Sequence, residues 1–441
     1  MTRVRLSSQS VFLLVVALLI APGAARAGHK TIARCGQGWL ETIDGYPVLH
    51  LKGTPYEMGY QHGILLKEHC RQNLDYLVNQ RGREKIELGP VAITARSAID
   101  SVVMLQKKFV PKKYFEEMDG LAAATGMKPQ DVYAGNFIPE LFHCSGFAVM
   151  NSATTDGTLY HGRVLDYAID WKLQNHAVLI VAEPDGEIPF ANVTYAGFIG
   201  SVTGMNAQHV SIGEMGGKGL GHWNGVPMAF LVREVLQKAH TLDEAVRLFR
   251  DNPRTCEYYF VVADGKSNRA VGLATDWQSM QVIHPNETHP KLPHAVRDAV
   301  LMSAGDRYEE LVRRVQAIHG QIDADKAIHL MDLPVAMKSN LHDALFAPAS
   351  TKMWIANASK DCQPAATQPY HAFQLSALLA SQPDARATVL PVGSKIIDSV
   401  TVSPSAVRDK RRGRSGRHAE IAEEEEKGEG ADRHEDGRTS K

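Results

Sequence analysis

Short apolar runs bounded by turn residues divide the middle of the chain into predicted strands. Runs of this length, with turn signals between them, are typical of strands that are buried in a sheet. The turn Pro184-Asp185-Gly186 separates two of them, which predicts a hairpin. The strands are expected at 145–149, 162–167, 177–183, 188–195, 198–205, 210–215, 258–263, 269–275 and 352–358.

Helical patterns lie before, between and after these strands. Residues 28–143 are predicted to be a helical segment, in which Thr54-Pro55-Tyr56-Glu57 forms a capping box with proline at the first helical position. A helix at 112–124 should end at Gly126 in a left-handed cap. Further helices are expected from Pro129 to Phe142, at 227–239, at 242–249 and within 295–332. Helices and strands in separate runs favour an α+β fold.

The first 27 residues have the pattern of a secretory signal peptide. Arg3 and Arg5 precede an apolar run at 11–21, and Ala25-Arg26-Ala27 is a small-x-small cleavage site. A run of about 11 residues is too short to span a bilayer comfortably, and no later segment is a convincing membrane helix. We therefore expect an exported protein, periplasmic or secreted, without a membrane span.

The other end of the chain changes composition after residue 403. A basic block at 408–417 is followed by a mostly acidic block at 420–429. Blocks of this kind cannot bury enough apolar surface to fold. Residues 403–441 are therefore predicted to be a disordered charged tail.

Overall charge and ligand motifs exclude several function classes. The chain has 441 residues with 48 basic and 49 acidic side chains, so its net charge of −1 provides no global field for nucleic acid. Its 19 histidines show no His-x-x-x-His or Cys-x-x-Cys spacing, and no phosphate loop or dinucleotide fingerprint occurs. We expect no metal, no cofactor and no nucleic-acid partner.

The strongest chemical signal is Cys144, which lies between a predicted helix end and an apolar strand. A turn at Asp156-Gly157 leads into a second strand that contains Arg163 and Asp166. Strand alternation puts these two side chains on opposite faces, unless the strand end twists or bulges. With such an irregularity, the hairpin returns an arginine and a carboxylate beside the cysteine.

This trio has a chemical purpose if the bond between His143 and Cys144 is cleaved. An α-amine with a pKa near roughly 7.7 to 8.0 is matched to a thiol with a pKa near roughly 8.5, so a terminal cysteine provides its own proton acceptor. The guanidinium of Arg163 would favour the thiolate, and the carboxylate of Asp166 would hold the ammonium. No histidine base is then required.

Cys144-Ser145, the Asp156-Gly157 turn and Gly162-Arg163-x-x-Asp166 together resemble the start of the mature chain in N-terminal-nucleophile amidohydrolases. More narrowly, they resemble the penicillin acyltransferase-like C45 peptidase family, with choloylglycine hydrolases and acid ceramidase as more distant relatives. The resemblance covers roughly 45–380 and includes the segments 53–63, 204–206, 210–214, 241–245 and 258–265. It implies a four-layer αββα sandwich with a helical N-terminal pro-segment.

The resemblance also implies how the chain is divided and what it does. Residues 28–143 would be a pro-segment, or α chain, that shields Cys144 until cleavage and then stays associated with the catalytic β chain, 144–402. The thiolate would attack the carbonyl of a small-molecule amide and form a thioester acyl-enzyme. The acyl group would pass to water, which we prefer because nothing resembles a coenzyme A phosphate site, or to an amine.

The oxyanion donor is less well defined by the resemblance. Choloylglycine-type relatives place an asparagine side chain shortly after the segment that is Gly204-Met205-Asn206 in this chain. Here Glu214-Met215-Gly216-Gly217 stands at that place. The candidates are therefore the backbone amides of Gly216 and Gly217, or the side chain of Asn206.

Two other functions remain open from the sequence. A papain-like cysteine hydrolase would use Cys144 with a distant histidine and an intact chain, and an inactive binding protein would use the same scaffold without chemistry. The five cysteines leave two further alternatives. Cys144 could be a structural thiol, or the chain could form two disulfides with one thiol left over, and the pairs to expect are then Cys35–Cys70 and Cys256–Cys362.

Overall fold

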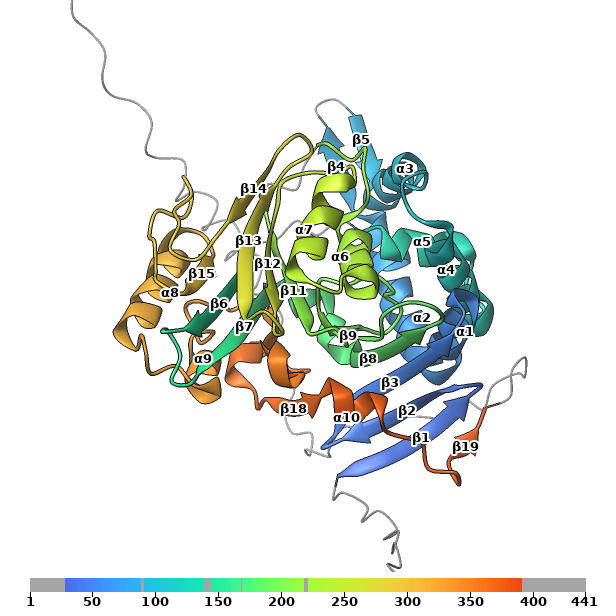
Figure 1. Cartoon of the computed structure of the whole chain (residues 1–441). Helices are drawn as coiled ribbons and strands as arrows, with labels where there is room; N and C mark the ends of the chain where they lie inside the picture. Colours follow the sequence, from blue (N-terminus) through green and yellow to red (C-terminus); the bar gives the residue numbers. More distant parts are fainter. Residues whose placement is uncertain (1–27, 89–90, 139–143, 168, 218–220, 391–441) are drawn as a thin grey trace, which may run out of the picture. The chain divides into compact units, whose positions relative to one another are not determined.

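A computed structural model describes residues 28–88, 91–138, 144–167, 169–217 and 221–390 of the chain (Figure 1). Backbone contacts divide the chain into a unit at Met1–Asp398 and a unit at Ser399–Lys441. The predicted signal peptide at 1–27 and the predicted tail at 403–441 both lie outside the described residues, so both stay predictions. Among the described residues, no helix combines the length and the apolar character that a membrane span requires.

The described strands form two main sheets and one separate hairpin, β4 (Lys85–Leu88) with β5 (Val91–Thr94). The large sheet has the order β14 (Met280–Ile283), β13 (Arg269–Thr275), β12 (Tyr258–Asp264), β11 (Val210–Gly216), β10 (Thr203–Asn206), β9 (Phe190–Tyr195), β8 (Ala177–Pro184), β3 (Tyr46–Gly53), β2 (Gly38–Ile43), β1 (His29–Cys35) and β19 (Thr388–Val389). The small sheet has the order β15 (Ala299–Met302), β6 (Ser145–Asn151), β7 (Gly157–Asp166), β16 (Asn340–Ala347), β17 (Lys352–Asn357) and β18 (His371–Gln374).

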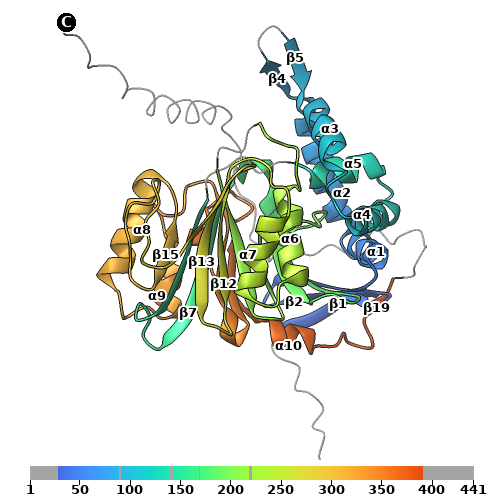
Figure 2. The ribbon, with the colours of Figure 1, turned by 45° about the horizontal axis from the view of Figure 1, so that its top comes forward.

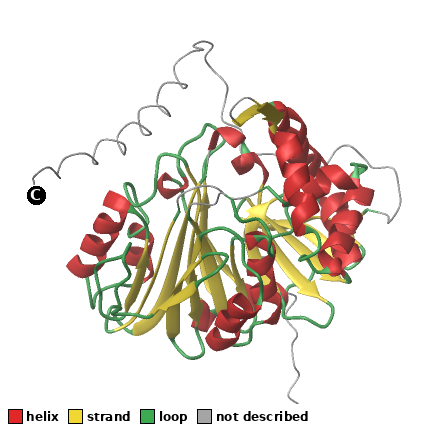
Figure 3. Cartoon of the chain, turned by 90° about the horizontal axis from the view of Figure 1, so that it is seen from above, coloured by secondary structure: helices red, strands yellow, loops and turns green. Residues whose placement is uncertain are grey.

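Helices cover the outer faces of both sheets (Figures 1 and 3). On the large sheet α6 (Met228–Lys238) packs against β10 and β11, and α7 (Leu242–Asp251) packs against β12. On the small sheet α8 (Gly305–Ala317) packs against β15, and α9 (Ala324–His329) packs against β7 and β16. A short helix, α10 (Leu375–Leu379), follows β18.

The main apolar core lies between the two sheets. Phe147 and Val149 from β6 share one buried cluster with Met215 from β11 and Val261 from β12. Burial of one face of each sheet against the other is the dominant favourable term for such an arrangement. Helix, sheet, sheet and helix therefore stack in that order, which confirms the predicted α+β fold with an αββα sandwich.

The N-terminal segment is helical from Pro55 onward but begins differently from the prediction. Residues 29–53 form β1 to β3 in the large sheet, where Leu40, Val48 and Leu49 are fully buried. β2 and β3 are joined by Asp44-Gly45, both with positive φ (49° and 84°), which is the geometry of a two-residue hairpin turn. The Asp-Gly pair between apolar runs is the sequence signal for this hairpin.

Five helices follow these strands and lie together beside them (Figure 2): α1 (Pro55–Leu65), α2 (Lys67–Asp75), α3 (Ala95–Gln106), α4 (Lys112–Thr125) and α5 (Pro129–Asn136). The capping box at Thr54 is confirmed, since the backbone N–H of Thr54 donates to the Glu57 carboxylate and that of Glu57 donates to the Thr54 hydroxyl. The left-handed cap at Gly126 is also confirmed, with φ 74°. Residues 139–143 are outside the described ranges, so the expected helix from Pro129 is followed only to Asn136.

Four of the described strands in the C-terminal third were not expected, namely β15, β16, β18 and β19. The region 295–332 contains β15 before its helices, and β16 was missed altogether. All eight residues of β16 are buried, because it lies between β7 and β17 in the small sheet. Its sequence mixes Asn340, His342 and Asp343 with apolar residues, so neither alternation nor a continuous apolar run marks it as a strand.

Candidate active site

The predicted hairpin exists, and it brings the start of β6 to the end of β7. Cys144 directly precedes β6 and is 4% exposed. The strands are antiparallel, with Ser145 opposite Val164 and Gly146 opposite Arg163. Asp166 ends β7 on the same side of the sheet edge, where it is paired with Asn340 of β16. The three sequence-predicted residues therefore lie at one end of two neighbouring strands.

An irregularity is present in β16, the strand that pairs with β7, and not in the part of β7 that carries Arg163 and Asp166. The register between β7 and β16 shifts between Asn340 and His342, so Leu341 is an extra residue beside Leu165 and Asp166. A bulge of this kind increases the local twist and redirects side chains at a sheet end. The sequence of the β6–β7 hairpin does not reveal this bulge, because the bulge lies in β16.

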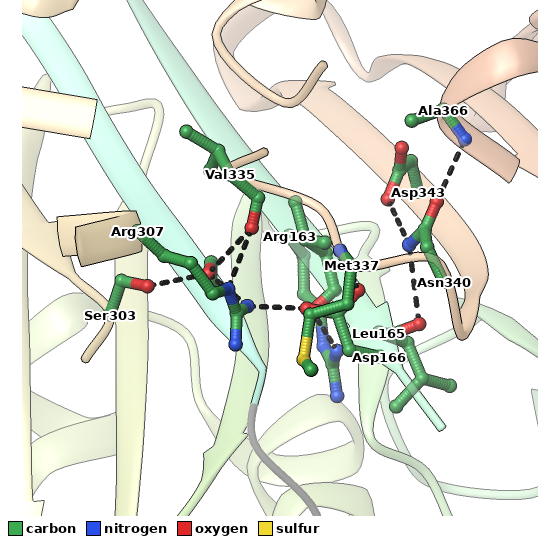
Figure 4. Close-up of polar contacts among 12 residues, drawn as sticks. Arg163, Leu165, Asp166, Ser303, Arg307, Val335, Met337, Asn340, Asp343 and Ala366 are labelled. Atoms are coloured by element: carbon green, nitrogen blue, oxygen red, sulfur yellow. Dashed lines mark hydrogen bonds and ion pairs between the residues drawn. The ribbon is translucent and has the colours of Figure 1, made fainter. Parts of the chain in front are cut away.

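Asp166 is buried and held by two donors (Figure 4). Its Oδ1 accepts a hydrogen bond from the backbone N–H of Met337 at 2.8 Å, and its Oδ2 is paired with the guanidinium of Arg307. Arg307, from α8, also donates to the hydroxyl of Ser145 at 2.6 Å. Burial raises the pKa of Asp166 to about 6, against the opposing effect of Arg307. Arg307 thus connects Asp166 to the residue that follows Cys144.

Arg163 is fully buried between the two sheets, where its partner is Glu214 of β11. Nη2 of Arg163 lies 3.2 Å from Oε2 of Glu214, and Nη1 donates to the carbonyl oxygen of Val164 at 2.6 Å. The arginine needs a glycine opposite it, because a Cβ atom at Gly213 would lie 2.5 Å from Cγ of Arg163. An exposed ion pair on the hairpin, the alternative for Arg163 and Asp166, is therefore wrong.

A buried polar group on β16 supports the end of β7. The side chain of Asn340 donates to the carbonyl oxygen of Leu165 at 3.2 Å and to Oδ1 of Asp343 at 2.8 Å, and accepts from the backbone N–H of Ala366 at 2.7 Å. Tyr370 donates its hydroxyl to the other oxygen of Asp343 at 3.0 Å. Burial raises the pKa of Asp343 to about 8, which favours its neutral form.

Asn206 must be withdrawn as an oxyanion donor, because all of its side-chain atoms have partners. Its amide nitrogen donates to the carbonyl oxygens of Leu236 and Ala239, and its amide oxygen accepts from the backbone N–H groups of Gln208 and Val210. Asn206 caps the turn between β10 and β11 and therefore lies next to the start of β11. The start of β6 lies beside the other end of that strand.

The other end of β11 lies beside the start of β6. A Cβ atom at Gly146 would be 2.6 Å from Sδ of Met215. Met215 lies about 17 Å further along β11 than Val210. Gly216 and Gly217, the other oxyanion candidates, are half-buried at this end, with Gly216 paired to Tyr258. Their backbone amides stay candidates.

His143, the predicted cleavage residue, lies outside the described residues. All five cysteines are described, and none of them forms a disulfide, so the expected pairs Cys35–Cys70 and Cys256–Cys362 do not occur. Burial raises the pKa of Cys35, Cys70 and Cys256, whereas Cys362 is exposed. Within the described ranges, no three histidine, cysteine or acidic side chains are grouped as metal ligands.

An apolar cavity of about 110 Å³ lies next to these groups. Its lining comes from both sides of residue 144: Leu77 and Ile138 on one side, Leu165 and Tyr195 on the other. Cys144 belongs to the same buried cluster as Leu77, Leu165 and Tyr195. Leu165 and Tyr167, the chain neighbours of Asp166, both line this space, whereas Cys144 does not line it.

Comparison with protein families gives one match, to "Acyl-coenzyme A:6-aminopenicillanic acid acyl-transferase", over residues 152–361. The matched region includes Arg163 and Asp166 and begins after Cys144. The assignment of Cys144 therefore depends on its place in the hairpin and on the residues around it.

Curated relatives include amide hydrolases. Protein dcd1B of Dictyostelium discoideum is 30% identical over 55% of this chain and 53% of its own length. The N-acylethanolamine-hydrolyzing acid amidase of Caenorhabditis elegans is 23% identical over 49% of this chain and 70% of its own length. Rat acid ceramidase is 25% identical over 36% of this chain and 46% of its own length. The chain spans about half to two thirds of the length of the first curated relatives that it matches.

Among solved structures, the chain is similar to the C. elegans N-acylethanolamine-hydrolyzing acid amidase ortholog, with TM-score 0.37 and 20% identity over 47% of this chain and 93% of that one. Penicillin V acylase from Agrobacterium tumefaciens has TM-score 0.35 and 11% identity over 53% of this chain and 86% of that one.

Proposed function

We propose that this chain is a member of the penicillin acyltransferase-like family, whose model matches residues 152–361, and that it is an exported, self-processing N-terminal cysteine amidohydrolase acting on linear N-acyl bonds. The observation that supports this most is the convergence of buried charge at the start of β6. Arg307 binds both Ser145 and Asp166, and Arg163 is held by Glu214 of the facing sheet. Perturbed buried charges beside a cavity are typical of active sites.

The reaction begins with cleavage of the peptide bond between His143 and Cys144, which leaves an amino group on Cys144. This amine accepts the thiol proton, and the sulfur attacks the amide carbonyl carbon of the substrate. The proton then passes to the leaving nitrogen as the C–N bond breaks, leaving a thioester. Water adds to the thioester carbonyl, the C–S bond breaks, and the acid and the thiol are released.

Asp166 has the capacity to position the new amino group. An ionised carboxylate accepts about four hydrogen bonds, and Met337 and Arg307 use two of these positions. The α-ammonium takes a further position, and its charge favours the ionised form of Asp166. Arg163, by contrast, faces the interior between the sheets, so its role is to hold the β6–β7 end through Glu214 and to add positive potential near the sulfur.

We expect Asp166→Asn to lower kcat at least about 100-fold with a smaller change in KM, since it misplaces the proton carrier in the transition state. In the native enzyme the active form of Asp166 is ionised, so activity should fall as the pH drops through a value no higher than about 6. Steady-state kinetics from pH 4 to 8 tests both points. Glu310→Gln is the control, because Glu310 is a partly exposed residue of α8 whose partners are Arg313 and Arg314. Near-normal kcat in Asp166→Asn would contradict the role.

Acyl transfer to an amine is a second outcome of the same intermediate, favoured by the acyltransferase family match. Adding an amine to the assay decides between them. Transfer predicts an N-acyl product that grows with amine concentration, whereas strict hydrolysis predicts free acid at every concentration.

The two chains produced by cleavage should stay associated. β3, before residue 143, pairs in parallel with β8, after it, inside the large sheet. Arg233 of α6 is paired with Glu117 of α4 at 2.9 Å, and both side chains are 3% exposed. The backbone ladder and this buried ion pair therefore cross the boundary between the proposed α and β chains.

We expect Arg233→Met to destabilise the protein by about 3 to 5 kcal/mol, because it leaves Glu117 buried without its ion partner. Lys238→Met on the same helix is the matched control, since Lys238 is half-exposed and its partner Glu234 keeps Lys113 and Tyr114, so the loss should be at most about 1 kcal/mol. Urea unfolding measures both, and native mass spectrometry should show the two chains together in the wild type. Equal effects of the two substitutions would contradict the buried-pair account.

A further inference from the structure

A second buried aspartate, Asp343, lies near the end of β7 (Figure 4). It is on β16, where burial and the charge of Asp166 on the neighbouring strand both raise its pKa. The titratable groups that face Asp343 are Asp166 and Arg163 of β7 and Tyr370, which precedes β18, and its partner on β17 is Ala356. Two buried carboxylates placed in this way disfavour each other's ionised form.

Both oxygens of Asp343 have partners that suit a neutral carboxyl. Oδ1 accepts from the side-chain amide of Asn340 at 2.8 Å, and Oδ2 lies 3.0 Å from the hydroxyl oxygen of Tyr370. Tyr370 donates to Oδ2 when the carboxyl is ionised, and it accepts the proton of Oδ2 when the carboxyl is neutral. The neutral form therefore loses no hydrogen bond and avoids a second buried negative charge. The pKa of Asp343, about 8, is higher than that of Asp166, about 6, so Asp166 ionises first as the pH rises.

Asn340 connects this carboxyl to the residue that precedes Asp166. The amide nitrogen of Asn340 donates to Oδ1 of Asp343 and to the carbonyl oxygen of Leu165 at 3.2 Å. Its amide oxygen accepts from the backbone N–H of Ala366 at 2.7 Å, which fixes the orientation of the amide. Asn340 is also the register partner of Asp166 across β7 and β16. A change at Asp343 therefore reaches the end of β7 through two hydrogen bonds.

We propose that Asp343 is a positioning residue that acts in its protonated form: its neutral carboxyl holds Asn340, and Asn340 holds the end of β7 so that Asp166 is ionised in the active arrangement. This inference rests on the proposed amidohydrolase function, in which ionised Asp166 binds the α-ammonium of Cys144. Ionisation of Asp343 places a second negative charge beside Asp166. It also draws the amide of Asn340 away from Leu165, since a charged acceptor forms the stronger hydrogen bond. Activity should therefore be lost as the pH rises through about 8.

Asp343→Asn tests the protonation state, because an asparagine amide has the shape of the neutral carboxyl and cannot ionise. Hydrolysis of N-hexanoyl-7-amino-4-methylcoumarin by the mature enzyme is measured from pH 5 to 9.5. In the wild type we expect kcat/KM to be at least about tenfold lower at pH 9.5 than at pH 7, and in Asp343→Asn to differ by less than about twofold. An equal fall in both proteins, or no fall in the wild type, would overturn the inference.

Asp343→Leu and Asp264→Asn are the comparison variants. Asp343→Leu removes the acceptor for Asn340, so kcat should fall by about tenfold or more at every pH, whereas Asp343→Asn should retain kcat at pH 7. Equal kcat values in these two variants would contradict the positioning role. Asp264 is a buried acid at the Val210 end of β11, where it accepts from the backbone N–H of Lys266. Asp264→Asn should keep the pH profile of the wild type, and loss of the fall at pH 9.5 in this control would contradict the assignment to Asp343.

A stability measurement separates failure of this inference from failure of the proposed function. An unfolded aspartate ionises at a pKa near about 3.9, whereas folded Asp343 keeps its proton up to about 8, so its contribution to stability decreases as the pH rises between these values. The thermal midpoint of Asp343→Asn minus that of the wild type should therefore increase from about pH 4 to about pH 8 and stay constant above. This result without hydrolysis at any pH would support the protonated carboxyl and refute the amidohydrolase function. A difference that does not change with pH would overturn the inference, whether or not amides are cleaved.

Discussion

Replacing Cys144 with alanine is expected to leave the chain uncleaved and to reduce amide hydrolysis by at least about 10⁴-fold, since removal of a catalytic nucleophile has effects of this order or larger. Both losses have one cause, because the same sulfur would attack the 143–144 peptide bond and the substrate. Denaturing electrophoresis and a coumarin-amide assay on the purified variant measure the two losses.

The matched control is Cys362→Ser, which removes the exposed thiol of the described chain. It should be cleaved and should retain near-wild-type activity. A Cys144→Ala variant that is cleaved, or that keeps its activity, would contradict the assignment. An uncleaved wild-type chain with activity that depends on Cys144 and on one histidine would instead support the papain-like alternative.

Replacing Arg163 with methionine is expected to lower stability by about 3 to 5 kcal/mol and to abolish activity, because it leaves the fully buried Glu214 without its ion partner. The double substitution Arg163→Met with Glu214→Leu should recover most of the stability, since a buried ion pair is often replaced by apolar residues at little net cost. Urea unfolding and kinetics on the same samples separate the two roles of Arg163.

The double variant decides between a structural and a chemical role for the pair. If it is stable but inactive, the positive potential of Arg163 is needed for the reaction. If it is stable and active, Arg163 only fills the space between the sheets, and its place in the proposed site would be wrong.

The sequence was most informative where the relevant residues lie close together in the chain. Cys144 and Asp166 fall within one hairpin, so the turn signal at Asp156-Gly157 and the strands on either side of it were enough to place both residues at the end of the hairpin opposite to the turn. The capping box at Thr54 was equally local, and it is present.

Residues that complete the site come from distant segments and were missed. Arg307 lies on α8 and Asn340 on β16, well over a hundred residues after Asp166, and only the pairing of β7 with β16 brings Asn340 beside it. Glu214 was noticed for its position but not as the partner of Arg163, because that contact crosses between the sheets. Asn206 was misassigned since a turn cap and an oxyanion donor have the same residue type.

The central claim is that active protein carries Cys144 at a new N-terminus. N-terminal sequencing and intact mass of the purified, active wild-type protein test it directly. The account predicts a chain that begins Cys-Ser-Gly-Phe, together with a second chain that ends at His143. Active protein with an unbroken bond between His143 and Cys144 would contradict it.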